Sequence, residues 1–178
     1  MKPLTRADGV SVGRLGLGGT SDTTPQLVDR AYRSGVDYFF TYSAAFEGMI
    51  RGVSTLGRRH REQIVIAAGD VSRSPDAMTR KRDQFLGLFD TSFLDIFFVE
   101  YVSPDDKPDD VRIALDLVSE WKEAGIIRYV GASVHDRDIA RDLAESGQVD
   151  VLMHRYNMAH RKSEDSVLPR AKAAGVPV

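Results

Sequence analysis

The chain has 178 residues, of which 42% are hydrophobic and 28% charged, and its formal net charge is −2. These values are typical of one folded globular domain, and the near balance of charge weighs against a nucleic-acid-binding protein. The absence of cysteine excludes disulfides, thiolate nucleophiles and cysteine-ligated metals within this chain. No apolar run approaches the roughly 18 residues of a membrane span, and the N-terminal residues lack a signal-like apolar region, so we expect a cytoplasmic protein.

Short apolar runs rich in β-branched and aromatic residues recur along the chain and predict buried strands. Helical stretches lie between them and begin or end at recognisable capping residues, such as Thr24 before Pro25, Ser74 before Pro75, and Gly125 after a helix over 109–123. Two further helices are predicted over 136–146 and 163–174. The predicted strands are 14–18, 36–40, 64–68, 94–99, 129–132 and 149–153, with a seventh beginning at Val176.

Alternating strands and helices predict βαβ units and a parallel sheet, as an open doubly wound sheet or a (β/α)8 barrel. The first strand ends in Gly16-Leu17-Gly18-Gly19-Thr20, which resembles a phosphate-binding turn. Ser21 replaces the third glycine of that motif, and no acidic residue follows the second strand cleanly. We therefore predict a single α/β domain over 1–178 of the (β/α)8 barrel type.

Six strands and the start of a seventh do not close an eight-stranded barrel. An unclosed barrel would expose two strand edges and an apolar interior. We therefore expect the sequence to be part of a longer protein, truncated within strand seven. The alternative is that another segment or a second copy of the chain completes the barrel.

Several stretches resemble the aldo-keto reductases, namely "RLGLGGT", "SFLDIFFVEY", "WKEAGIIRYVGAS" and "VDVLMHRYN". The resemblance covers essentially the whole chain and corresponds to about the first six βα units of that barrel. The stretches "VGASVHDRD" and "MHRYN" resemble a divergent bacterial branch. The resemblance implies an oxidoreductase by descent that acts on a small molecule at the carboxyl ends of the strands.

The resemblance also shows that the four catalytic residues of the family are replaced. The family uses an aspartate, a tyrosine, a lysine and a histidine. The matching positions hold Phe40, Ala45 or Phe46, Gly69 and Glu100. These replacements remove the usual proton donor and the groups that adjust its pKa, so they weigh against ordinary NADPH-dependent carbonyl reduction.

The cofactor contacts implied by the family are retained only in part. Ser133 matches a residue that holds the nicotinamide carboxamide, whereas Val134 and Met153 replace the asparagine and glutamine that accompany it. The family's phosphate-binding loops follow strands seven and eight, outside this sequence. The family therefore implies NADP(H) as the cofactor, although fewer of its contacts are retained. No metal is expected.

Polar residues at the strand ends define a candidate site, because functional groups of such barrels lie there. The resemblance implies inward side chains at Glu100 and Ser133. Alternation from the family's inward positions, Phe40 and Met153, predicts the same side for Tyr42 and Arg155. We predict catalytic roles for Glu100, Tyr42 and His135, substrate binding by Arg155, Asp70 and Thr41, and cofactor binding by Ser133. An arginine in this set favours a substrate with an anionic group.

Structural interpretations compete with these roles. Glu100 and Arg155 could form a buried ion pair, and Tyr42 could be a core aromatic residue. His154 is expected to face the helices with both ring nitrogens satisfied, and the basic run 58–61 to be the solvated end of a helix. A metal centre, or a glycosidase-like pair of Glu100 and Asp70, has no further support in the sequence.

Two functions follow. The first is an enzyme that uses NADPH with a different acid or has lost redox chemistry, as a lyase, dehydratase or isomerase would. The second is a non-catalytic binding or partner subunit with the same fold.

Overall fold

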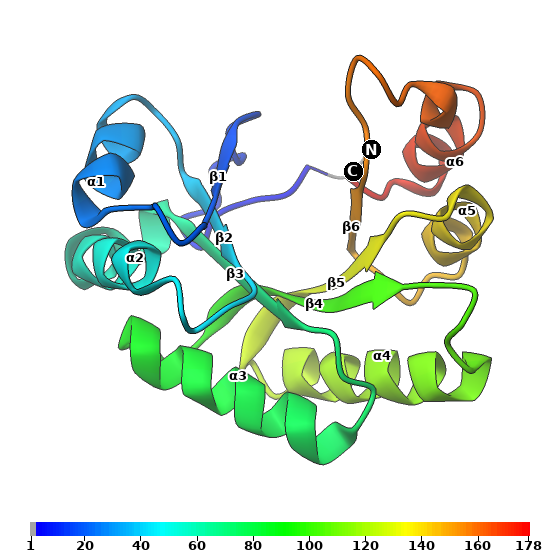
Figure 1. Ribbon diagram of the computed structural model, residues 1–178, viewed down its shortest axis with the longest axis horizontal. Helices are drawn as coiled ribbons and strands as arrows, with labels where there is room; N and C mark the ends of the chain where they lie inside the picture. Colours follow the sequence, from blue (N-terminus) through cyan, green and yellow to red (C-terminus); the bar gives the residue numbers. More distant parts are fainter. Residues whose placement is uncertain (1–2) are drawn as a thin grey trace.

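The computed structural model describes residues 3–178 and consists of alternating strands and helices around one curved sheet (Figure 1). The strands are β1 Gly16–Gly18, β2 Tyr38–Thr41, β3 Val65–Asp70, β4 Leu94–Val102, β5 Ile127–Val134 and β6 Val151–His154. The α-helices are α1 Pro25–Arg33, α2 Glu47–His60, α3 Pro75–Phe89, α4 Pro108–Glu123, α5 Arg137–Glu145 and α6 Val167–Ala174. Two 3-10 turns, η1 Arg61–Gln63 and η2 Lys162–Glu164, complete the set.

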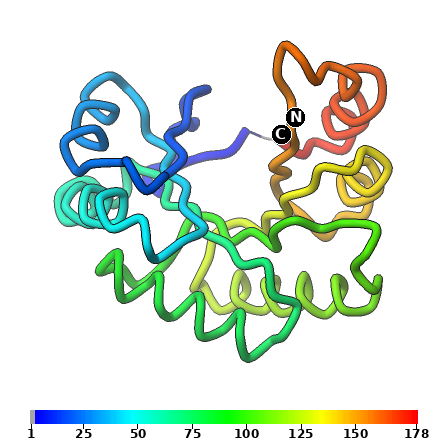
Figure 2. Tube along the Cα trace, in the orientation of Figure 1, coloured from blue at the N-terminus to red at the C-terminus, as the bar shows by residue number. Residues whose placement is uncertain are grey.

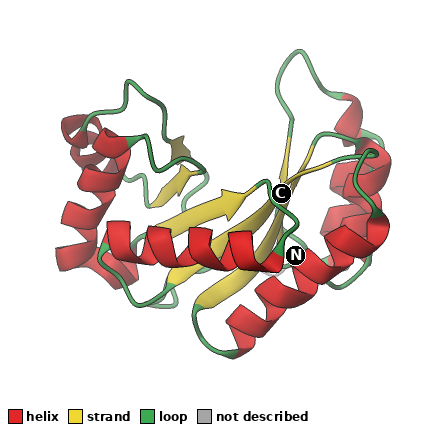
Figure 3. Cartoon of the chain, turned by 60° about the horizontal axis from the view of Figure 1, so that its bottom comes forward, coloured by secondary structure: helices red, strands yellow, loops and turns green. Residues whose placement is uncertain are grey.

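The six strands are parallel and follow one another across the sheet in sequence order, as βαβ units require. The helices lie along the outer side of the curled sheet, while the opposite, concave side carries no helix of residues 3–178 (Figure 3). The predicted α/β class and incomplete (β/α)8 barrel are therefore confirmed. Among the helices of residues 3–178, none is long and apolar enough to cross a membrane.

The chain also approaches β6 again where the seventh strand is predicted. The Leu152 N–H donates to the Pro177 carbonyl at 2.9 Å. Residues 176–178 are not assigned as a strand, but this hydrogen bond places them beside β6, where the next strand of a barrel would lie.

Two apolar clusters lie on opposite sides of the sheet. The larger one fills the space between strands and helices and includes Phe97, Val99 and Trp121. The smaller one lines the concave side and contains Val65, Ala67, Ile96, Phe98 and Val151, with Tyr38, Phe40, Tyr129 and Met153 packed against it. This division confirms which side chains along each strand face the barrel interior.

The predicted helix over 163–174 is broken in the structure. Residues Lys162–Glu164 form a 3-10 turn, and the α-helix begins only at Val167. Pro169 explains the late start, because a proline lacks the amide hydrogen and clashes with the preceding turn unless it lies near a helix N-terminus. The prediction of one continuous helix is wrong for this reason.

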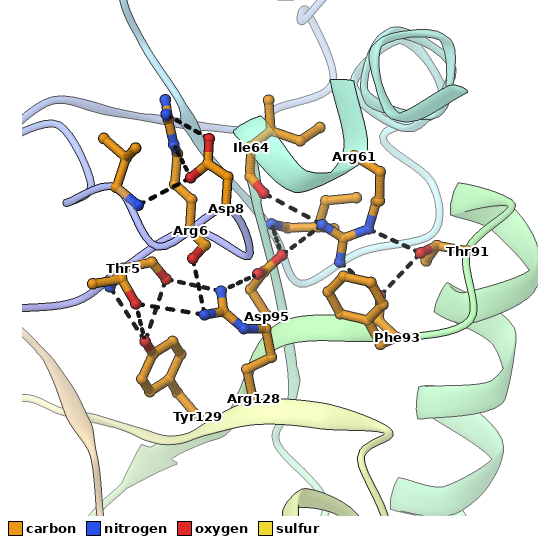
Figure 4. Close-up of polar contacts among 12 residues, drawn as sticks. Thr5, Arg6, Asp8, Arg61, Ile64, Thr91, Phe93, Asp95, Arg128 and Tyr129 are labelled. Carbon is orange, nitrogen blue, oxygen red and sulfur yellow. Dashed lines mark hydrogen bonds and ion pairs between the residues drawn. The ribbon is translucent and has the colours of Figure 1, made fainter. Parts of the chain in front are cut away.

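A buried ionic network lies near the amino ends of β4 and β5 (Figure 4). Asp95 is fully buried, and its carboxylate contacts Arg61 at 2.8 Å and Arg128 at 2.9 Å. The same carboxylate accepts a hydrogen bond from the Ile66 N–H at 2.9 Å. Arg61 also stacks on the Phe93 ring at 3.7 Å from its centroid. The expectation that the basic run is solvated is therefore wrong for Arg61, because a buried carboxylate draws its side chain inward.

Candidate active site at the carboxyl ends of the strands

The carboxyl ends of β2 to β6 meet on one side of the sheet and form the mouth of the half-barrel. Its floor is apolar: the rings of Phe40 and Phe98 meet edge to face at 5.7 Å. The Phe98 ring also lies over Gly131, at a place where a Cβ atom would come within 2.9 Å of three ring atoms. Met153 packs against the same cluster. The floor of the mouth is therefore formed by aromatic and aliphatic side chains.

Glu100 is the one buried acidic residue of this floor. It is 2% exposed, and its Oε1 atom is buried without a hydrogen-bond partner among residues 3–178. Burial raises the pKa of the Glu100 carboxyl to about 7, and the nearby charge of Asp70 adds to the increase. Lys81 and Arg73 oppose this increase only in part. A carboxyl with this pKa exists in both protonation states near neutral pH.

Gly69 makes room for the Glu100 side chain. A Cβ atom at Gly69 would lie 2.7 Å from the Glu100 Cγ and 2.7 Å from the Phe98 carbonyl oxygen. Gly69 pairs with Phe98 across β3 and β4, so the Glu100 carboxyl reaches back over the neighbouring strand on the concave side. Gly69 and Glu100, which the resemblance aligns with the family's lysine and histidine, therefore share one space.

We predict that Gly69→Ala lowers the free energy of unfolding by about 1–3 kcal/mol, because the added methyl group overpacks the floor of the site. Gly57→Ala is the matched control. Gly57 lies within α2 and has no atom within 4 Å of an added Cβ, so this change should stabilise by about 0.5–1 kcal/mol. Urea denaturation of both variants checks the prediction, and equal effects of the two changes would contradict it.

A pair of charged side chains holds the backbone around Glu100. Arg73 contacts the Asp106 carboxylate at 3.0 and 3.1 Å and donates to the Glu100 carbonyl at 2.9 Å. Asp106 also accepts from the Ser103 N–H at 2.9 Å. Between these contacts β4 has an irregular register, and Tyr101 has a φ of 54°. No sequence motif predicts this Arg73–Asp106 ion pair, the clasp around Glu100, since the two residues lie 33 residues apart in different loops.

The predicted residues Tyr42 and His135 lie at the rim. Tyr42 is 47% exposed, with its ring 5.1 Å from Phe46 and 6.3 Å from Phe40. The alternative that Tyr42 is a core aromatic residue is therefore wrong. His135 is exposed and packs edge to face on Tyr101 at 5.5 Å. Sequence reasoning missed Tyr101, because the bulge in β4 changes which way this residue points.

Thr41 and Asp70 lie on the helix-facing side of their strands. Thr41 is 1% exposed, pairs in register with Ala68 of the outer core, and donates its hydroxyl to the Ser43 carbonyl at 3.1 Å. Asp70 is the last residue of β3 rather than a loop residue, and it borders a groove with α3 that includes Lys81. Their assignment to substrate binding stays a prediction, and this geometry gives Asp70 an electrostatic effect on Glu100 instead.

The structure tests what was expected of Arg155 and His154, the residues at the end of β6. Arg155 is exposed and makes no ion pair with residues 3–178, so the alternative of a buried Glu100–Arg155 pair is wrong. His154 is satisfied, as predicted: its Nδ1 lies 2.8 Å from the Val134 carbonyl and its Nε2 2.7 Å from the Ser163 hydroxyl. The carbonyl can only accept, so Nδ1 carries the proton and Nε2 accepts from Ser163.

The residues that would meet a nicotinamide ring fit this group poorly. Ser133 is 5% exposed and lies opposite Met153 in the register of β5 and β6. Its hydroxyl can bond a carboxamide, but the Met153 thioether is only a weak acceptor, and the Val134 side chain has no polar atom. These positions supply one good polar contact, so the residues present do not fit the nicotinamide group.

A curved parallel sheet whose strands follow one another in sequence order, with a candidate site at their carboxyl ends, is typical of (β/α)8-barrel proteins. Comparison with known proteins gives the particular family. The model of the aldo/keto reductase family matches residues 18–178, and the chain belongs to this family.

Solved structures of the family share the fold at low sequence identity. An aldo-keto reductase from Bacillus halodurans in its holo form has a TM-score of 0.81 and 20% identity, with all of this chain and 65% of that chain covered. An aldo-keto reductase from Klebsiella pneumoniae, solved with NADP and acetate, has a TM-score of 0.80 and 20% identity, with 100% and 67% covered. These likenesses establish the fold alone.

Among curated proteins, the NADH-specific methylglyoxal reductase of Escherichia coli (strain K12) is 24% identical over 105 residues. The match covers 59% of this chain and 32% of the relative. The chain thus spans about a third of that curated relative and 65% of the Bacillus halodurans structure.

Proposed function

We propose that this aldo-keto reductase family member catalyses proton transfer on a small molecule, with Glu100 as the acid or base. The single observation that carries the proposal is the Glu100 carboxyl, which is buried at the mouth, has one oxygen without a partner among the described residues, and has its pKa raised to about 7. General acid–base catalysis is most effective when the pKa of the group is near the working pH. Buried groups with such pKa values occur preferentially at functional sites.

The chemistry that this arrangement supports is that of a lyase, dehydratase or isomerase. In each case the Glu100 carboxylate removes a proton from the carbon next to a carbonyl group, and the C–H electron pair forms an enolate with its charge on the carbonyl oxygen. In an isomerase, the Glu100 carboxyl then returns the proton to another atom of the enolate. In a dehydratase or lyase, the enolate electron pair expels the group on the next carbon, and the carboxyl gives the proton to that leaving group, which departs as water in the dehydratase. Tyr42 and His135, on the rim, are proposed to bind the substrate or exchange protons with it. Ordinary carbonyl reduction is disfavoured because Phe40 and Gly69 cannot supply the family's charged groups.

A second candidate is an NADP(H)-dependent reductase, in spite of the poor fit of Val134 and Met153 to the nicotinamide. Two observations favour it: Ser133 is retained on the concave side, and relatives of the same fold were solved with NADP or NADPH. Titration of the full-length protein with NADPH, followed by nucleotide fluorescence, separates the two candidates. Binding supports the reductase, and no binding overturns it.

The proton-transfer proposal is tested by hydrogen exchange into candidate substrates. The full-length protein is incubated in D2O with a panel of 2-oxo acids and hydroxy ketones, and loss of the proton next to the carbonyl is followed by NMR. We expect exchange that slows about 100-fold in Glu100→Gln, because the general base is removed. Glu120→Gln, an exposed position on α4, is the matched control and should exchange at the unchanged rate. Absence of exchange across the panel, or equal rates in Glu100→Gln and the control, would overturn the proposal and favour a non-catalytic member.

A further inference from the structure

A strongly basic cavity lies beside the mouth, between the loop after β5 and the long loop after β6. Figure 2 shows the second loop as an extended excursion (orange) between β6 and α6. The cavity has a volume of about 240 Å3, and seven of its nine lining residues are histidine, arginine or lysine. None of the nine is acidic, whereas the whole chain has 24 Lys and Arg against 26 Asp and Glu. The positive charge is therefore a local concentration in a chain of net charge −2.

Some of these basic groups already have partners. Arg161 contacts the Glu164 carboxylate at 3.0 and 3.1 Å. The His154 ring bonds Val134 and Ser163, as described above, and His160 lies 3.1 Å from the Asn157 amide oxygen. In the nearest helix, α5, the Asp138 and Ile139 N–H groups donate to the Asp136 side chain and are therefore already used.

Three cations remain without a counterion. Arg137, Arg155 and Lys162 form no ion pair or side-chain hydrogen bond with any residue of 3–178. They come from different segments, since Arg137 opens α5, Arg155 follows β6, and Lys162 opens η2. Three like charges around one concave surface raise the local positive potential and concentrate anions there.

We propose that this cavity binds the phosphate group of a small phosphorylated molecule. A phosphate matches the site because its oxygens accept several hydrogen bonds and its double charge satisfies more than one cation. Arginine forks bind phosphate in bidentate geometry, and two of the three unpaired cations are arginines. The cavity is larger than a phosphate group alone, so it has room for the carbon atoms attached to it.

The position of the cavity links it to the mouth. His135 lines the cavity and also packs on Tyr101 at the rim, in the bulged part of β4 that follows Glu100. A molecule held here by its phosphate would extend past His135 toward the mouth. This part of the inference rests on the proposed function, whereas phosphate binding does not.

Binding is tested on the full-length protein by calorimetric titration at low salt, with inorganic phosphate, glycerol 3-phosphate and glycerol as probes. We expect both phosphates to bind, glycerol not to bind, and affinity to fall as NaCl is raised. Tighter binding of glycerol 3-phosphate than of inorganic phosphate would identify a phosphorylated metabolite as the occupant; equal affinities would overturn that assignment and leave a site for free phosphate.

Variants locate the bound phosphate. Arg137→Gln/Arg155→Gln should weaken glycerol 3-phosphate binding by about 100-fold, since each lost charge-assisted hydrogen bond weakens binding about tenfold. Arg51→Gln, an exposed arginine of α2, is the matched control and should bind as the wild type does. Circular dichroism verifies that both fold. Loss of binding in Arg51→Gln to the same extent, or no phosphate binding by the wild type, would overturn the proposal.

Glu100→Gln separates this proposal from the proposed function. The variant should bind glycerol 3-phosphate with unchanged affinity, because its carboxyl is not part of the cavity lining. If phosphate binds and no substrate exchanges its proton, the cavity stands and the catalytic proposal fails. If a substrate exchanges its proton and no phosphate binds, the catalytic proposal stands and the phosphate-binding cavity fails.

Discussion

Glu100→Gln is expected to raise the free energy of unfolding at pH 8. Relative to the effect of the same change at pH 4.5, the gain should be about 3 kcal/mol, because a shift of one pKa unit corresponds to about 1.4 kcal/mol. The pKa of Glu100 is raised from 4.5 to about 7 in the folded protein. Between these values the folded state binds more protons than the unfolded state, so the stability of the wild type falls as the pH rises. A neutral glutamine does not titrate, so it contributes no such pH dependence to the stability.

The measurement is urea denaturation from pH 4.5 to pH 8, followed by the fluorescence of the buried Trp121, which is 5% exposed. The difference between variant and wild type should grow between pH 4.5 and 7 and then level off. Glu120→Gln controls for the loss of a carboxylate at an exposed site, and its curve should run parallel to the wild type. A Glu100→Gln curve that is also parallel to the wild type would show that the carboxyl titrates normally.

Asp95→Ala is expected to lower the free energy of unfolding by about 3–5 kcal/mol, because removing one partner leaves buried charges uncompensated. Asp95 is fully buried, while Arg61 and Arg128, which it pairs, are 16% and 25% exposed. The change also leaves the Ile66 N–H without its acceptor. Since the whole stability of a typical domain is about 5–15 kcal/mol, this single change removes a large fraction of it.

Asp116→Ala is the control for Asp95→Ala. Asp116 pairs with Arg112 at 3.3 Å on the surface of α4, and both side chains are more than half exposed. Such exposed pairs contribute about 0–1 kcal/mol. Chemical denaturation of the two variants, or recovery of folded protein if Asp95→Ala fails to fold, measures the contrast. Equal losses of stability would mean that the network is not stabilising.

Much of the fold could be predicted from the sequence, because a parallel sheet buried on both sides leaves near-continuous apolar runs, and helix ends carry capping residues. The strands and their parallel order follow from that pattern, whereas the inward side of Phe40 and Met153 follows from the family resemblance. Boundaries were less certain: the helix predicted over 163–174 begins as an α-helix only at Val167, since Pro169 restricts it.

Part of the candidate site could also be predicted. The family resemblance placed Glu100 on the concave side and strand alternation placed His154 on the outer side, and both assignments agree with the structure. Arg155 was expected to reach the same interior as Glu100, but β6 ends at His154, so alternation no longer constrains the residue after it.

The sequence by itself determined the family and the parallel sheet, because these depend on residue identity and on the local period of apolar side chains. The replacement of the usual catalytic groups stays a prediction from the resemblance. Only the tertiary structure decided which side chains lie together at the mouth and beside it. The Glu100 carboxyl over Gly69, the Arg73–Asp106 clasp, and the three unpaired cations beside the mouth join segments far apart in the chain. Burial, electrostatic shifts and counterion pairing depend on distances across strands, and no spacing along the sequence encodes them.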